Sequence, residues 1–157
     1  MALTRRFLLL LAAALPLAAA VAAGFDLITP GEYHTERGLE AQPGAKFVTR
    51  GADFNGPTIT VNKPDAQTTL HPPVDIDVQF TPSPGATVDI KSLKILYGFL
   101  KLDVTQRILQ APGVEVSPSG LKAPGAKLPP GSHKLLIEVA DNLGRVGRRP
   151  VEFTVAQ

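Results

Sequence analysis

Apolar and polar residues alternate over several short stretches of this chain. The clearest is PVDIDVQFTP, residues 73–82, in which Val74, Ile76, Val78 and Phe80 are separated by acidic or amide side chains. Alternation with a period of two predicts a β-strand with one buried face and one solvent-facing face. The prolines at both ends fix the limits of this strand, because proline cannot donate a hydrogen bond within a central ladder.

The same alternation recurs at 59–61, 93–97, 100–104, 114–116, 121–123, 135–139 and 151–155. A bend is expected near Gly98 and Phe99, and a short helical turn is expected in DVTQRIL, residues 103–109. The 15 prolines and 14 glycines of the chain concentrate between the apolar runs, as turn residues do. Short strands separated by turns predict an all-β protein, a single antiparallel β-sandwich of about seven strands over residues 57–157.

Residues 1–23 have a different character. A basic start with Arg5 and Arg6 precedes an apolar run rich in alanine and leucine, which ends in small residues at 20–23. This pattern predicts a cleaved secretory signal peptide, and therefore a periplasmic or secreted protein with no stable membrane insertion after cleavage. The alternative is an anchoring helix, since the run is borderline in length for spanning a membrane. The arginine pair leaves twin-arginine export open beside the general secretory route.

Residues 24–56 have no sustained period and are interpreted as a leader that packs loosely on the domain or stays mobile. One short helix is expected near 30–40. Thr29 would be its N-cap, Pro30 its first residue and Glu32 the partner in a capping box.

The charge and the cysteine content of the chain argue against nucleic-acid binding and against disulfide bonds. The chain has 16 basic and 14 acidic residues, and two of the basic ones leave with the signal, so 14 of each remain. Nucleic-acid binding needs a basic surface, so no nucleic-acid partner is expected. The chain has no cysteine, so packing rather than disulfide bonds must stabilise the exported domain.

Two segments carry a resemblance to bacterial immunoglobulin-like domains: PVDIDVQFTPSPGATVD and LPPGSHKLLIEVADNLGRVGRRPVEFTV. The second resembles the last two strands of such domains, with a Leu-Pro approach, a strand, an A-D-x-x-G turn and a closing strand. The resemblance covers about residues 57–157 and implies an immunoglobulin-like sandwich without the Cys and Trp of antibody domains. It implies little about function, because this architecture serves adhesins, spacers, metal carriers and enzyme-associated modules.

Metal binding is the alternative function. His71 and His133 stand at strand ends and could meet at one edge, with Asp141 nearby, and periplasmic copper carriers share the sandwich architecture. The chain offers no cysteine, and Met1 leaves with the signal, so soft ligands are absent. These two histidines are the candidate ligands of a copper or zinc protein, whereas a histidine that packs inward and hydrogen-bonds a turn needs no metal. No other cofactor is expected.

Catalysis has little support in the residues. Asp75 and Asp77 share one face of a strand, a placement that suits paired carboxylates or calcium, but solvent-facing alternation produces the same pattern. No phosphate-binding glycine loop, G-x-S-x-G turn or H-E-x-x-H helix occurs. We therefore expect no enzyme activity and assign no catalytic residue.

Two sets of residues are candidates for contact with a protein partner. Tyr97 and Phe99 flank Gly98 and would form a small apolar patch if exposed, although at least one is expected to pack in the core. A basic rim near the turn at Asp141 and Gly144 could bind an anionic partner or form a solvated loop; it consists of Arg145, Arg148 and Arg149. The chain is therefore interpreted as an exported, non-catalytic binding or structural module of the bacterial cell envelope, in contact with another envelope protein.

Overall fold

The computed structural model describes residues 24–43 and 55–157. The predicted signal peptide and residues 44–54 of the leader lie outside the described residues. The elements in chain order are β1 (Phe25–Asp26), α1 (Pro30–Glu40), β2 (Thr58–Lys63), β3 (Thr69–Leu70), β4 (Val74–Thr81), β5 (Val88–Tyr97), β6 (Leu102–Asp103), α2 (Thr105–Leu109), β7 (Glu115–Ser117), β8 (Gly120–Lys127), β9 (Gly131–Asp141) and β10 (Val146–Val155).

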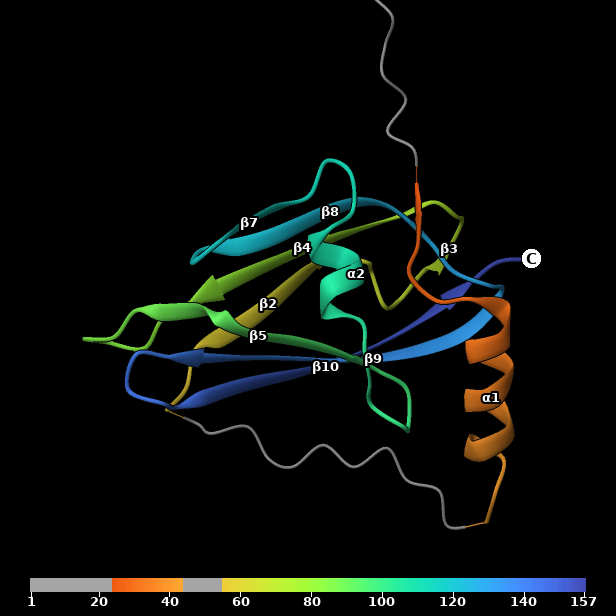
Figure 1. Ribbon diagram of the computed structural model, residues 1–157, viewed down its shortest axis with the longest axis horizontal. Helices are drawn as coiled ribbons and strands as arrows, with labels where there is room; N and C mark the ends of the chain where they lie inside the picture. The colour runs from red at the N-terminus through yellow and green to blue at the C-terminus, as the bar shows by residue number, and fades with distance from the viewer. Residues whose placement is uncertain (1–23, 44–54) are drawn as a thin grey trace, which may run out of the picture.

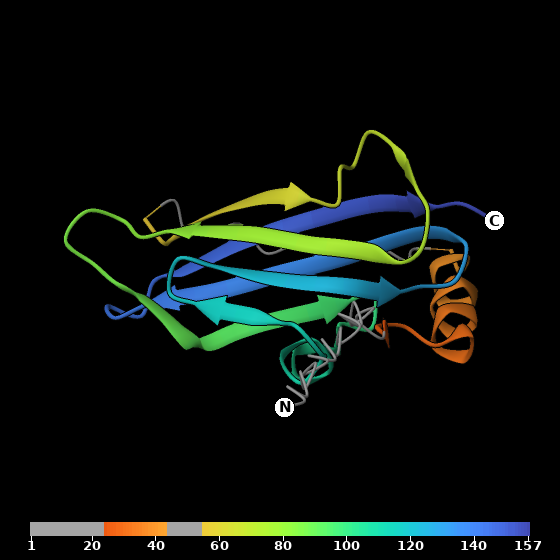
Figure 2. The same ribbon diagram turned by 90° about the horizontal axis from the view of Figure 1, so that it is seen from above.

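The strands form two sheets that pack face to face (Figures 1 and 2). Sheet I has the order β1, β8, β4, β2, with β7 also paired to β8, and sheet II has the order β3, β10, β9, β5, β6. The short pairs β1–β8 and β3–β10 are parallel, and the other pairs of the described residues are antiparallel. Seven of these strands have three or more residues. The predicted all-β sandwich is confirmed.

The core lies where the alternating apolar residues of the two sheets meet. In β4 the four apolar side chains predicted to face inward are all buried, and the residues between them are exposed or half-buried. In the final hairpin Leu135 pairs with Val151, and both side chains are buried. A period of two therefore places side chains correctly wherever it is unbroken, because successive residues of a strand point to opposite faces.

The region around Gly98 differs in part from the prediction. β5 begins at Val88 rather than near residue 93, because Ser92 bridges an irregular stretch by accepting a hydrogen bond from the Ala140 N–H at 2.7 Å. The predicted strand at 100–104 shortens to the two residues of β6, since a turn with positive φ at Gly98 and Lys101 occupies the preceding positions. The expected helical turn is present as α2.

β8 is longer than the short strand predicted at 121–123. It runs from Gly120 to Lys127 and lies between β4 and the strands β1 and β7. Pro124 and Gly125, which read as a strand end in sequence, fall where the register between β4 and β8 shifts. Pro124 is tolerated in this irregular stretch because no regular ladder bond is required of it.

The described part of the leader packs firmly on the domain, in contrast to the loose packing expected. Leu27 is 0% exposed and Ile28 is 2% exposed, and both belong to the main hydrophobic core. β1 adds to sheet I beside β8. These short apolar pieces lack a period of their own, so the sequence does not reveal that they complete the core.

Helix α1 begins and ends close to the predicted limits. The Thr29 hydroxyl accepts a hydrogen bond from the Glu32 N–H at 3.3 Å, and the Glu32 carboxylate accepts one from the Thr29 N–H at 2.9 Å, which is the predicted capping box. α1 lies across one end of the sandwich (Figure 1), beyond the start of β9. Among residues 24–43 and 55–157, no helix is both long and apolar enough to cross a membrane.

We expect Ile28→Ala to lower the free energy of unfolding by about 2–4 kcal/mol, because a large side chain is removed from a fully packed site. Ile90→Ala is the matched control, since Ile90 is only partly buried against the same core. Urea unfolding of the two variants measures the difference. Equal, small losses in both would contradict the placement of the leader in the core.

Candidate functional site

Three glutamates of α1 form the main connection between this helix and the sandwich. Glu32, Glu36 and Glu40 are spaced four residues apart, so they follow one face of the helix. Each reaches a different element: α2, the β5–β6 turn and β9, respectively. We call these three side chains the carboxylate row.

Glu36, in the middle of the row, holds the β5–β6 turn. Its side chain is nearly buried, and its two carboxylate oxygens accept hydrogen bonds from the N–H groups of Phe99, at 2.7 Å, and Leu100, at 3.0 Å. A Cβ at Gly98 would lie 2.3 Å from the Glu36 carboxyl group, and Gly98 has a φ of +67°. The turn therefore requires glycine at this position, both for its backbone conformation and for the approach of the carboxylate.

The clamped turn presents two apolar side chains to solvent. Phe99 is 38% exposed and Leu100 is 57% exposed. The turn is also closed by hydrogen bonds from the Gly98 N–H to the Lys134 carbonyl, at 2.9 Å, and from the Lys101 N–H to the Gly98 carbonyl, at 3.2 Å. We call Phe99 and Leu100 the tip. These hydrogen bonds hold the backbone of the tip in place.

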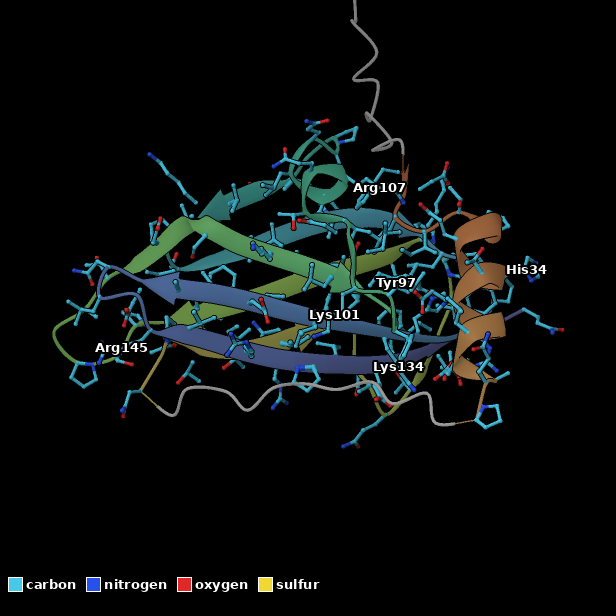
Figure 3. The ribbon with its side chains drawn as sticks, turned by 60° about the horizontal axis from the view of Figure 1, so that its bottom comes forward. His34, Tyr97, Lys101, Arg107, Lys134 and Arg145 are labelled. Atoms are coloured by element: carbon cyan, nitrogen blue, oxygen red, sulfur yellow. The ribbon has the colours of Figure 1, made fainter. Side chains whose placement is uncertain are left out.

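The two outer members of the row form ion pairs. Arg107 of α2 donates two hydrogen bonds to the Glu32 carboxylate, at 2.6 and 2.8 Å, and a third to the Leu27 carbonyl, at 3.0 Å. The bond from Arg107 lowers the pKa of Glu32 to about 2. Lys134 of β9 donates to Glu40 and lowers the pKa of that carboxyl group. Figure 3 shows Arg107 and Lys134 on the side of the sandwich where α1 lies.

His133 is buried beneath α1 at 1% exposure. Its Nε2 lies 2.8 Å from the Pro129 carbonyl oxygen, and its Nδ1 lies 3.0 Å from the Tyr97 hydroxyl. A carbonyl only accepts, so Nε2 carries the hydrogen, and in the neutral imidazole Nδ1 accepts from the Tyr97 hydroxyl. Burial favours this neutral form. Burial lowers the pKa of His133 and raises the pKa of Tyr97.

The candidate metal ligands do not form a cluster. Both ring nitrogens of His133 are engaged, whereas His71 is exposed just after β3. Asp141 lies at the far end of β9, where Arg145 binds it. In the part of the chain that the structure describes, no three His, Cys, Asp or Glu side chains are close enough to hold a metal ion together.

The predicted partner-contact residues are divided between core and surface. Tyr97 is 2% exposed, because it continues the inward alternation of β5, and its hydroxyl lies 3.0 Å from Nδ1 of His133. Phe99 is on the surface. Sequence reasoning missed Leu100, whose exposure follows from the turn rather than from a strand pattern.

The basic rim lies at the other end of the sandwich from α1, as the position of Arg145 in Figure 3 shows. Arg145 pairs with Asp141 at 2.7 Å, and Arg148 pairs with Glu138 at 2.8 Å, whereas Arg149 is exposed. Burial would raise the pKa of Asp141, but hydrogen bonds from the Arg145 backbone and guanidinium outweigh this effect and lower it. These ion pairs partly neutralise the rim.

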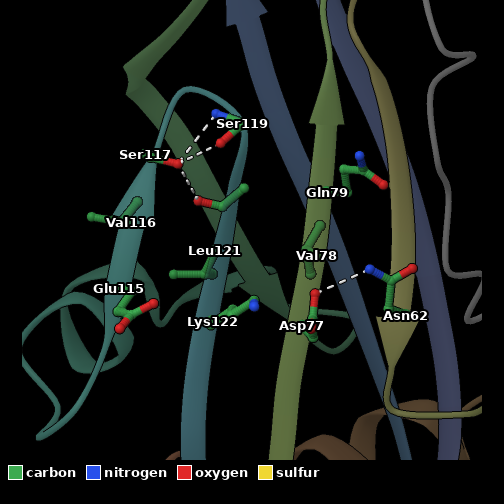
Figure 4. A pocket seen from close by; sticks show the side chains of 11 residues that line it. Asn62, Asp77, Val78, Gln79, Glu115, Val116, Ser117, Ser119, Leu121 and Lys122 are labelled. Atoms are coloured by element: carbon green, nitrogen blue, oxygen red, sulfur yellow. Dashed lines mark hydrogen bonds between the residues drawn. The ribbon is translucent and has the colours of Figure 1, made fainter.

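Asp75 and Asp77 share a face, as predicted, on the outer side of sheet I. A groove of about 540 Å³ runs over this face (Figure 4). Asp77 accepts a hydrogen bond from the Asn62 amide at 3.1 Å, and Asp75 pairs with Lys63 at 3.2 Å. The two carboxylates therefore have separate partners. The groove is lined by Asn62, Asp77, Val78, Gln79, Glu115, Val116, Ser117, Ser119, Gly120, Leu121 and Lys122.

Comparison with solved structures finds proteins of similar fold. The chain is similar to the crystal structure of CopC from Methylosinus trichosporium OB3b, with a TM-score of 0.41 and 18% sequence identity over 64% of this chain and 93% of that one. No protein-family model and no curated protein matches the chain. The assignment to immunoglobulin-like domains stays a prediction.

Glu32 makes the stability of the protein depend on pH. Because its pKa is lowered from 4.5 to about 2, the stabilisation is complete above pH 4.5 and is lost as the pH falls toward 2. We expect the free energy of unfolding to fall further across this window in the wild type than in Glu32→Gln, which keeps the cap but loses the charge. Urea unfolding at several pH values measures this difference, and parallel curves would contradict it.

Proposed function

We propose that this chain is an exported, non-catalytic binding module of the bacterial cell envelope, and that it acts through protein–protein contacts. The observation that carries the proposal is the tip. Two apolar side chains stand on a turn whose backbone is fixed by a nearly buried carboxylate.

A fixed apolar tip is suited to binding a protein. Side chains that bury completely in a partner supply most of the binding energy of an interface. A contact whose backbone is already ordered loses little conformational entropy on binding, so more of this energy remains as affinity. Phe99 and Leu100 satisfy both conditions, since they are exposed and their backbone N–H groups are bound by Glu36.

The acid–base groups of the domain support a non-catalytic role. His133 and Tyr97 are hydrogen-bonded to each other, with exposures of 1% and 2%, so a substrate in solution does not reach either group. On the outer face of sheet I, Asp75 and Asp77 have separate hydrogen-bond partners rather than sharing one reacting centre. Export is supported by the basic and apolar pattern of residues 1–23.

A photo-cross-linking amino acid at position 100, in the native cell envelope at neutral pH, tests the contact. Leu143 provides the matched control, because it is 63% exposed in the β9–β10 turn at the other end of the sandwich. We expect one recurrent protein to be attached through position 100 and not through position 143.

The partner found in this way is then purified and titrated with the mature protein. Phe99→Ala should weaken binding about tenfold or more, as expected for a side chain at the centre of an interface. Equal attachment from both positions would contradict the proposal that the tip contacts the partner. An affinity that Phe99→Ala leaves unchanged would contradict it as well.

A further inference from the structure

His133 occupies the boundary between α1 and the sandwich. Its ring centroid lies 5.1 Å from that of Tyr33 on α1, 5.8 Å from that of Tyr97 on β5 and 5.6 Å from that of Phe153 on β10. A Cβ at Gly131 would lie 1.9 Å from the Tyr33 hydroxyl, so α1 sits directly against the start of β9. Any change in the charge of His133 therefore acts where the helix meets the strands.

In the described part of the chain, no carboxylate is a hydrogen-bond partner of His133. On α1 the charge that acts on the ring is that of Arg37, which has the same sign as a protonated His133. Glu36 and Glu40 keep their negative charges, but their carboxylates bind the β5–β6 turn and Lys134. β5 and β10 offer the neutral Tyr97 and the apolar Phe153.

The hydrogen bonds of His133 also suit the neutral ring. Nε2 already donates to the Pro129 carbonyl, and a proton on Nδ1 would force the Tyr97 hydroxyl to change from donor to acceptor. A buried charge without a partner of opposite sign is unfavourable, so protonation favours a state in which the imidazole reaches water.

We infer that mild acid charges His133 and detaches α1 from the sandwich, which releases the Glu36 clamp on the tip. The significance of this release for partner binding rests on the proposed function, whereas the conformational change does not. The helix is the element that moves, because α1 is joined to the domain largely through the polar carboxylate row, whereas Tyr97 and Phe153 belong to paired strands. Thus binding through the tip is strongest at neutral pH and weakens in mild acid.

The docked helix is more stable at neutral pH than in mild acid, because the buried ring of His133 is neutral. Burial lowers the pKa of His133 below the ordinary value of 6.5, so its stabilisation of the docked helix is complete above 6.5. This stabilisation is lost as the pH falls from 6.5 through the lowered pKa.

The chain contains its own reporter of this event. It has two tyrosines, Tyr33 and Tyr97, and no tryptophan, and both tyrosine rings contact His133. Tyrosine fluorescence and near-ultraviolet circular dichroism therefore report on this site, whereas amide hydrogen exchange in β4 and β10 gives a separate signal for the strands. The mature protein is titrated from about pH 8 to about pH 5, above the range in which ordinary carboxylates titrate.

We expect the tyrosine signals to change with a midpoint below about pH 6.5, while the strand signal stays constant. His133→Gln retains a donor and an acceptor but gains no charge in this range, so its tyrosine signals should not change. His71→Gln is the matched control, since His71 is exposed, and it should titrate like the wild type. The ring of His34 lies 6.0 Å from that of Tyr33, so every protein in this comparison carries His34→Gln, which leaves His133 as the histidine whose effect on the tyrosines is compared.

Three results would overturn the inference: constant tyrosine signals in the wild type, a titration that persists in His133→Gln, or simultaneous loss of the strand signal. If His133→Gln does not fold, the protonation of His133 is followed instead in the wild type, by nuclear magnetic resonance of the histidine ring protons. In that measurement a His133 that titrates at or above the values of the exposed histidines would overturn the inference. Cross-linking at neutral pH is independent of this titration, so the proposed function and the acid response can each fail alone.

Discussion

The contact between the Glu36 carboxylate and the N–H groups of Phe99 and Leu100 organises one end of this molecule. Hydrogen bonds to a charged group contribute about 1.5–3 kcal/mol each, more than neutral ones, and their strength increases where water is excluded. Glu36 is 8% exposed, so loss of this contact would leave a nearly buried charge without its partners. The position of α1, the shape of the β5–β6 turn and the exposure of the tip all depend on it.

Polar contacts hold α1 because the end of the sandwich where it lies is not fixed by a disulfide bond. The sheets bury their apolar faces against each other, but the chain has no disulfide to fix the ends. Leu27 and Ile28 close the core from the N-terminal side, and α1 then follows on the outside with a mainly polar sequence. A helix with few apolar residues must be held by directed contacts, and the carboxylate row supplies them.

The strands were predictable where their signal is local. Alternation identified β4, β9 and β10 and the direction of their side chains, because a period of two depends only on neighbours in sequence. The capping box of α1 was predictable for the same reason. β8 was underestimated, since Pro124 and Gly125 interrupt the pattern without ending the strand.

The site was mostly not predictable, because its contacts join distant parts of the chain. Glu36 is 63 residues from Phe99, and Glu40 is 94 residues from Lys134. The spacing of the three glutamates is visible in the sequence, but it indicates only a shared helix face. Phe99 was identified as a surface candidate from its place beside Gly98, whereas its neighbour Tyr97 belongs to the core by the alternation of β5.

Amide hydrogen exchange at Phe99 and Leu100 tests most directly whether Glu36 holds the tip. Glu36→Gln replaces one accepting oxygen with an amide that cannot accept, whereas Glu115→Gln changes an exposed carboxylate on β7 and serves as the control. At constant neutral pH we predict about tenfold or greater loss of protection at these two amides in Glu36→Gln, with the amides of β4 unchanged. Equal protection in the wild type and in Glu36→Gln would contradict the account.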